Sequence, residues 1–186
     1  MPTIGNAKIL IISTHGFEQS ELEVPRDQLR EAGATVHVAT LHGKSIRGWD
    51  NNNWGGEVEA DLKVADVNTA EYDALVIPGG QINPDLLRVE RDVISRVKEF
   101  HNQGKVIAAV CHAPWVLVEA GIVEGREVTS YHSVKTDMIN AGGKWTDAAV
   151  VADAGIVTSR QPDDLDAFVA KIIEEIEEGA HERKAA

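Results

Sequence analysis

Three short apolar runs, each followed by turn-forming or polar residues, do most to limit what this chain can fold into. The runs are Lys8–Ser13 before His15-Gly16, Ala74–Ile77 before Pro78-Gly79-Gly80, and Val106–Val110 before Cys111. Runs of this length are typical of parallel strands that are buried on both faces. Residues 85–101 and 163–178 carry apolar side chains at helical spacing. This alternation predicts an α/β fold, with a mostly parallel sheet covered by helices on both faces.

Three further segments add detail to this architecture. Residues 36–39 are predicted to form another strand, and Val150-Val151 is predicted to form a hairpin with Ile156-Val157. Pro25 lies inside the first predicted helix, where a proline should kink the helix or make it restart.

Length and composition indicate one domain over residues 1–186, with a core at about 7–178 and a tail at 179–186. Hydrophobic residues make up 43% of the chain and charged residues 26%, as in ordinary globular domains. Residues 47–59 are predicted to be one long irregular insertion, and residues 181–186 a frayed end.

The charge balance and the lack of long apolar runs exclude several classes of protein. The formal net charge is −12, which would repel a polyanion, so no nucleic-acid partner is expected. The longest apolar runs fall far short of the ~20 residues that span a bilayer, and the first ten residues do not resemble a signal peptide. We therefore expect a cytoplasmic protein without a membrane partner.

Cys111 is the only cysteine and the strongest candidate for a catalytic residue. It follows a predicted strand and precedes a predicted helix, with Ala109 and Ala113 two positions to either side, which is the spacing of a nucleophile elbow. The start of the helix should lower the thiol pKa. The alternative is a buried cysteine that ends a core strand.

Two other predicted strand ends should lie at the same edge of the sheet. Gly79-Gly80 could turn backbone N–H groups toward an oxyanion, although a plain turn is an alternative. Glu18 could keep its proton and donate a hydrogen bond to the Cys111 sulfur, or it could simply be an acid in the first turn of a helix.

Several residues are candidates to assist the thiol. His112 is a candidate base, and Asp85 could orient it or could cap a helix. His132 is a second candidate base. Trp115 could line a pocket, contact another subunit or only pack, and His15 is a further possible site residue. The histidines lack metal-ligand spacing, so neither a metal nor another cofactor is expected.

Four ordered motifs together resemble the ThiJ/PfpI family over about residues 7–178. They are Gly16-Phe17-Glu18-x-x-Glu21-Leu22, Ile77-Pro78-Gly79-Gly80, Ala109-Val110-Cys111-His112-Ala113-Pro114 and Asp137-Met138-Ile139-Asn140-Ala141-Gly142. The resemblance implies a flavodoxin-like sheet with a nucleophile elbow at its carboxyl edge and a reactive Cys111. It also implies a protonated carboxyl partner at Glu18 and an oxyanion hole formed by the N–H groups of Gly79, Gly80 and His112.

The resemblance also implies function and assembly. Family members form dimers or hexamers, and an acid from a neighbouring subunit, here at the position of Asp85, can complete a Cys-His-acid triad. His132 falls where some relatives keep a histidine near the thiol. The first expectation is a stress-response cysteine hydrolase of glyoxalase or deglycase type, acting on small carbonyl compounds or glycated protein. Alternatives are an intracellular cysteine peptidase that takes peptide substrates, and a redox sensor or chaperone with an oxidisable Cys111.

Overall fold

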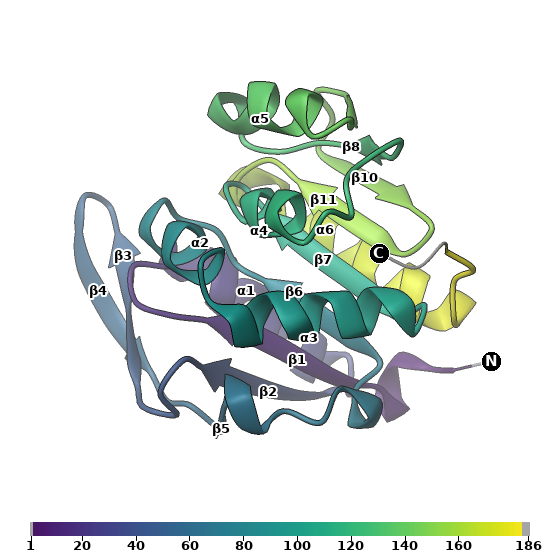
Figure 1. The fold of residues 1–186 in the computed structure, drawn as a ribbon. Coiled ribbons are helices and arrows are strands. Elements are labelled where there is room, and N and C mark those ends of the chain that lie inside the picture. The colour runs from purple at the N-terminus through teal and green to yellow at the C-terminus, as the bar shows by residue number, and fades with distance from the viewer. Residues whose placement is uncertain (1, 184–186) are drawn as a thin grey trace.

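A seven-stranded sheet forms the centre of the protein in a computed structural model, which describes residues 2–183 (Figure 1). The strands lie in the order β10-β11-β7-β6-β1-β2-β5, and all neighbours are parallel except β10 and β11. Their bounds are β1 Lys8–Ser13, β2 Thr35–Thr40, β5 Leu62–Lys63, β6 Ala74–Ile77, β7 Val106–Val110, β10 Val150–Asp153 and β11 Ile156–Ser159. The predicted flavodoxin-like parallel sheet is confirmed.

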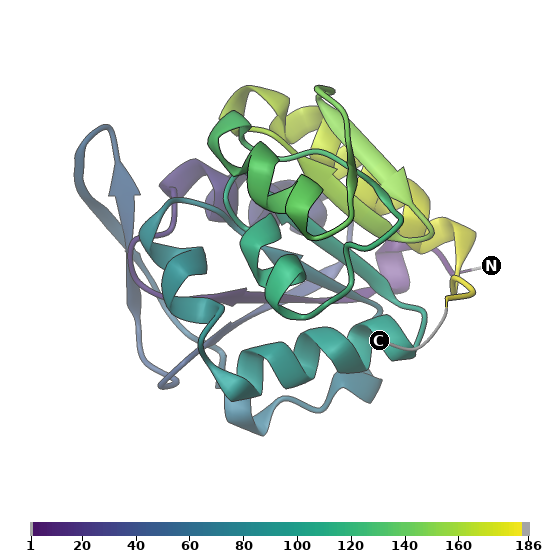
Figure 2. The same cartoon turned by 45° about the horizontal axis from the view of Figure 1, so that its top comes forward.

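Helices cover both faces of the sheet (Figures 1 and 2). They are α1 Gln19–Glu31, α2 Ile82–Leu87, α3 Arg91–Asn102, α4 Pro114–Glu119, α5 Lys135–Asn140 and α6 Leu165–Glu178. Side chains along β1 alternate between two buried clusters. Ile9 and Ile11 pack toward α1 and α6, whereas Leu10 and Ile12 pack on the side of α3 and α4. This two-residue alternation is why the strand is apolar throughout.

Residues 85–101 do not form one continuous helix. The structure has α2 and α3 separated by a turn in which Val89 is 74% exposed. The buried stripe of α3 begins only at Val93, and Leu86 is largely exposed. Leu86 therefore does not extend that stripe, and the prediction of one helix is wrong.

Residues 47–59 form an ordered β-hairpin rather than an irregular insertion. Strands β3 Ile46–Asp50 and β4 Asn53–Val58 pair antiparallel and project from one end of the molecule (Figure 2). Asn51 and Asn52 join them with positive φ angles of 46° and 69°. Asparagine tolerates this left-handed region better than most residues, so the pair suits a tight hairpin turn.

The other sequence predictions have mixed outcomes. The hairpin between β10 and β11 is confirmed. Helix α1 runs through Pro25 without restarting. A small parallel pair, β8 Glu127–Val128 with β9 Lys144–Trp145, lies outside the main sheet.

The chain end is packed rather than frayed as far as it is described. The His181 N–H donates to Gly104 O at 2.8 Å, and Arg183 Nη2 donates to Lys105 O at 2.8 Å. Residues 184–186 of the predicted frayed end lie outside the described residues. These bonds attach the end of the chain to the loop that precedes β7.

Candidate active site

Cys111 lies at the turn between β7 and α4, as the elbow motif predicted. Its φ of +62° is in the left-handed region, which is unfavourable for a residue with a side chain. The turn is held on both sides, because the Cys111 N–H donates to Ser159 O at 3.0 Å and the Cys111 carbonyl accepts from Tyr131 N at 2.9 Å. Ala113, the small neighbour, is fully buried. The surrounding chain therefore maintains a strained elbow that presents the sulfur.

Glu21, and not Glu18, is the carboxyl partner of the thiol, which corrects the prediction for Glu18. Glu21 is fully buried in α1 and accepts the Gly79 N–H on Oε2 at 2.9 Å, and its carboxyl is close enough to the thiol to raise the pKa of Cys111. Glu18 precedes the helix and is only partly buried beside the cavity. The motif contains both acids three residues apart, the spacing of neighbours on a helix, so the sequence alone could not separate them.

Burial governs the protonation of this pair. It raises the pKa of Glu21 to about 8, with a smaller contribution from the nearby Glu18 charge. Glu21 is therefore mostly protonated at pH 7. Burial also raises the pKa of Cys111, and the Glu21 carboxyl adds to this increase, whereas the N–H groups of Gly80 and His112 lower it by less. The predicted lowering of the thiol pKa by the helix end is thus wrong for the resting site.

His112 is placed to take the thiol proton. Its Nδ1 is 3.1 Å from Cys111 Sγ, and burial followed by the nearby His132 lowers its pKa, which keeps the imidazole neutral and able to accept. Tyr131 stacks on the ring at 4.8 Å between centroids, and Ser133 Oγ lies 3.3 Å from Nε2. These contacts fix the orientation of the ring.

Ser133 was not among the predicted site residues, although it directly follows the candidate base His132. His132 itself is exposed, with its ring against Tyr131 at 4.3 Å. The structure thus places His112, rather than His132, next to the sulfur.

Trp115 packs edge-on against the His112 ring at 5.2 Å. Its indole N–H donates to Asp137 at 2.8 Å.

Two of the three predicted oxyanion donors remain available. The Gly79 N–H is bonded to Glu21, so it does not point at a developing oxyanion, and this corrects the prediction. The N–H groups of Gly80 and His112 lie close enough to the sulfur to lower the pKa of Cys111. Backbone donors in this position can stabilise negative charge on an oxygen attached to the attacked carbon.

Two other predicted residues lie away from the thiol within one chain. Asp85 is exposed in the first turn of α2, in a shallow hollow that it shares with Arg88 and Trp115. Gln81, and not Asp85, occupies the cap position of that helix. His15 is exposed and its Nδ1 accepts the Arg47 N–H at 3.0 Å, which ties the turn after β1 to the hairpin.

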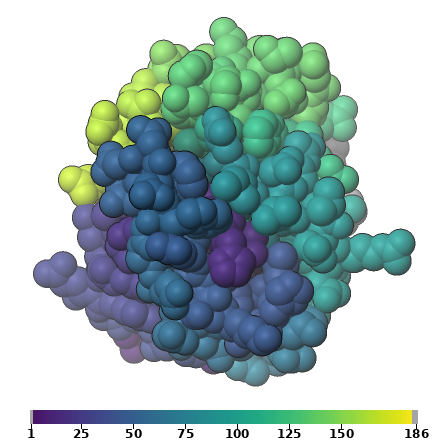
Figure 3. Space-filling view, turned by 90° about the vertical axis from the view of Figure 1, so that its left-hand side faces the viewer, coloured from purple at the N-terminus to yellow at the C-terminus, as the bar shows by residue number. Residues whose placement is uncertain are grey.

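A cavity of about 570 Å³ opens onto the sulfur. Its lining comes from distant parts of the chain: Gly16, Glu18, Glu21, Trp49, Asn52, Gly80, Gln81, Ile82, Cys111, His112, Tyr131 and Pro162. Figure 3 faces the end of the molecule that carries the hairpin, where purple, blue and teal segments meet on one surface. The lining contains two glutamates and neither lysine nor arginine, so the cavity favours neutral or cationic groups over anions.

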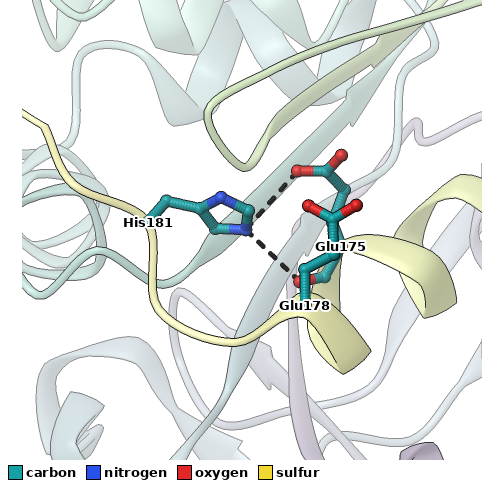
Figure 4. A group of neighbouring side chains, drawn as sticks. All are labelled: Glu175, Glu178 and His181. Atoms are coloured by element: carbon teal, nitrogen blue, oxygen red, sulfur yellow. Dashed lines mark hydrogen bonds and ion pairs between the residues drawn. The ribbon is translucent and has the colours of Figure 1, made fainter. Parts of the chain in front are cut away.

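Among residues 2–183, one group of side chains has the spacing of metal ligands. Glu175, Glu178 and His181 bring their ligand atoms within 4.8 Å of one another (Figure 4). His181 Nε2 already lies 3.4 Å from Glu175 Oε2 and 3.3 Å from Glu175 O. Glu175 also accepts the Gly155 N–H, next to the start of β7 and therefore at the opposite end of that strand from Cys111. The group attaches the chain end and has no contact with the thiol site.

Among the helices of residues 2–183, none has the length and apolar composition that crossing a bilayer requires.

Known proteins similar to this chain share its fold and most of its length. The family model described as the DJ-1/PfpI family matches residues 7–175. A deglycase of Pyrococcus horikoshii is 39% identical over 166 residues, which cover 89% of this chain and 97% of the relative. General stress protein 18 of Bacillus subtilis is 39% identical over 163 residues, or 87% of this chain and 92% of the relative. The crystal structure of Drosophila melanogaster DJ-1beta matches with a TM-score of 0.84 and 30% identity, over 93% of this chain and 95% of that one.

Proposed function

Since the chain belongs to the DJ-1/PfpI family, we propose that it is a stress-response cysteine hydrolase of glyoxalase or deglycase type. Its substrates would be small α-oxoaldehydes such as methylglyoxal, or their adducts on glycated protein. The single observation that carries this proposal is the 3.1 Å separation of Cys111 Sγ and His112 Nδ1 at an elbow that opens onto the cavity. A thiol with a neutral base in contact is suited to attack a carbonyl carbon.

The first step follows from the positions of the donors and acceptors. His112 Nδ1 accepts the thiol proton as the sulfur forms a bond to the carbonyl carbon. The electron pair of the carbonyl π bond moves to oxygen, and the N–H groups of Gly80 and His112, which already lower the pKa of the thiol, would stabilise the charge that develops there. Protonated Glu21 keeps a second negative charge away from the sulfur.

The test is turnover of methylglyoxal by the purified protein, with Cys111→Ser as the matched control. Loss of methylglyoxal and formation of the hydrated product are expected for the parent and not for the variant. Cleavage of casein by the parent, without methylglyoxal turnover, would contradict the proposal and favour the peptidase alternative.

A redox sensor is a second candidate, favoured by the contact between Glu21 and the sulfur. If peroxide oxidises Cys111 to a sulfinic acid, a protonated Glu21 could donate a hydrogen bond to the new anion. Mass spectrometry under mild peroxide tests this function. Sulfinate that stops at that stage in the parent but proceeds to sulfonate in Glu21→Leu is expected of a sensor, whereas the same oxidation in both proteins counts against it.

The proposal includes a cytoplasmic location and a homo-oligomer, dimeric or hexameric. A cytoplasmic location would keep the unpaired Cys111 reduced. Self-association is supported by apolar exposure on α2 and the turn after it, where Ile82 is 39% exposed, Leu86 42% and Val89 74%. Asp85 lies on the same surface and would approach a neighbouring His112 only from another subunit. Light scattering that gives 20.1 kDa at micromolar concentration would refute the oligomer and the shared triad.

A further inference from the structure

One buried amide, that of Asn83, connects the strand ends behind the candidate site. Asn83 is in α2 and is fully buried. Its Oδ1 accepts from the Thr14 N–H at 2.7 Å and from Ser13 Oγ at 3.2 Å, just past and at the end of β1. Its Nδ2 donates to Pro78 O at 2.7 Å and to Gly79 O at 3.4 Å, just past the end of β6. Both polar atoms of the amide are therefore engaged with backbone or side-chain partners.

The two carbonyls held by Asn83 belong to two successive peptide units. In a trans peptide the N–H points away from the C=O, so a bond to the carbonyl also sets the direction of the N–H. In the first unit, the Gly79 N–H is directed at Glu21 Oε2, at 2.9 Å. In the second unit, the Gly80 N–H lies beside the thiol and the Glu21 carboxyl and lowers the pKa of both groups. Asn83 thus holds the first unit from behind through Pro78 O, and it shares the second with the Glu18 N–H, which donates to the same Gly79 carbonyl at 3.4 Å.

Glycine is required in this loop and makes such support necessary. A Cβ on Gly79 would come within 2.7 Å of the Cys111 Cβ, and one on Gly80 within 2.6 Å of Gly16 O. Two successive glycines leave their peptide units free to rotate. A rotated Gly79–Gly80 unit would turn a carbonyl oxygen, rather than an N–H, toward the sulfur and toward any oxyanion formed there. The site therefore needs an external contact that fixes the orientation of the loop.

We propose that Asn83 is a positioning residue that keeps the Gly80 N–H directed at the reacting centre and the Gly79 N–H directed at Glu21. Its effect on turnover rests on the proposed function, whereas its effect on the thiol does not. Asn83 itself would not contact substrate, because its donors are bonded to the carbonyls of Pro78 and Gly79.

Two substitutions separate the donor from the rest of the side chain. Asn83→Asp keeps an acceptor for the Thr14 N–H and loses the donor, although it adds a charge. Asn83→Ala loses the donor without adding a charge. Ser13→Ala is the matched control, because it removes a bond to Oδ1 and leaves the bonds to both carbonyls in place. For each protein, three quantities are measured: the pH dependence of iodoacetamide alkylation, kcat and KM for methylglyoxal, and the midpoint of thermal unfolding.

Both Asn83 variants are expected to lower kcat by about ten- to a hundredfold while KM changes less than about threefold. This loss is below the roughly hundred- to thousandfold cost of deleting an oxyanion donor. The midpoint of alkylation is expected to move to higher pH in both variants, because the Gly80 N–H lowers the thiol pKa. Ser13→Ala should keep kcat and the alkylation midpoint.

The proposal is overturned if either folded Asn83 variant keeps the parent alkylation profile, even where its thermal midpoint falls, since Asn83 would then serve only stability. If the parent does not turn over any carbonyl substrate, the proposed function fails, and the alkylation profiles still decide the role of Asn83. If Asn83→Ala does not fold, Asn83→Leu, which is close in volume and also lacks the donor without adding a charge, gives the same decision with Ser13→Ala as control.

Discussion

Two buried glutamates at opposite ends of the sheet have different roles because their surroundings differ. One belongs to the candidate active site, and the other stabilises the end of the chain. Glu21, at the carboxyl end, accepts the Gly79 N–H and lies beside the thiol, and its Oε1 has no hydrogen-bond partner in the described part of the chain. Glu175, at the amino end, has the Gly155 N–H and the His181 ring, with the Arg183 guanidinium nearby. The first carboxyl lacks a cation and gains a raised pKa, whereas the second is surrounded by partners that anchor the chain end.

The largest difference between the two ends should appear when Cys111 is replaced by serine. Turnover of methylglyoxal is expected to fall by more than about a thousandfold, because the weaker nucleophile removes the chemical step. The thermal midpoint should hardly change, since serine is nearly isosteric with cysteine. Steady-state kinetics measures the loss of turnover, and calorimetry on the same preparation measures the thermal midpoint. A large fall in the thermal midpoint of Cys111→Ser would show that Cys111, at the carboxyl end of the sheet, also stabilises the fold.

Glu21→Gln should remove much of the pH dependence of stability. The pKa of Glu21 is raised to about 8 from an ordinary 4.5, so the folded state binds this proton more tightly than the unfolded state does. The parent should therefore be most stable below pH 4.5, as far as this group is concerned, and should lose stability as pH rises toward 8. At 1.36 kcal/mol per unit, the loss has an upper limit of about 5 kcal/mol.

Urea unfolding at pH 5 and pH 8 measures this difference for the parent and for Glu21→Gln. The variant should show the smaller change between the two pH values. Equal changes would mean that Glu21 ionises normally. The same variant should move the alkylation midpoint of Cys111 to lower pH, because it removes a carboxylate that raises the thiol pKa.

His181→Ala tests the amino end, where the expected effect is on stability alone. The substitution removes the pair with Glu175 and should lower the free energy of unfolding by about 1–2 kcal/mol. Turnover and the pH profile of Cys111 should match those of the parent, because the site lies at the far end of β7. Reduced turnover in a fully folded variant would show that the two ends are coupled.

Ser133→Ala should give the smallest effect. The Ser133 hydroxyl orients His112 through Nε2 at 3.3 Å, and Tyr131 still stacks on the ring without it. We expect a two- to fivefold fall in kcat, roughly the cost of a hydrogen bond of about 0.5–1 kcal/mol, with KM unchanged. His132→Ala leaves this bond in place and removes only a smaller influence on the His112 pKa, so it is the comparison variant and should change kcat less than Ser133→Ala does. A larger loss of kcat in His132→Ala than in Ser133→Ala would favour His132 over His112 as the base.

The elbow and the sheet could be predicted from sequence because both depend on local patterns. Apolar runs specify the strands, and small residues around Cys111 specify the turn. Whether Glu18 or Glu21 lies beside the thiol depends on which side of the start of α1 faces Cys111 at the end of β7. This is a property of the tertiary structure. The engagement of the Gly79 N–H and the contact of Ser133 with His112 likewise join segments far apart in the chain. Periodicity contains no information about such contacts.

The bond from the Cys111 N–H to Ser159 O also sets when the nucleophile is completed during translation. Ser159, which supplies that carbonyl at the end of β11, is synthesised 48 residues after Cys111 (159 − 111 = 48), and the ribosome makes chains from the amino end at about 5–20 residues per second. For several seconds, the growing chain contains the cysteine without one of the contacts that hold it at a φ of +62°. A reactive thiol is thus assembled only when most of the protein has already emerged.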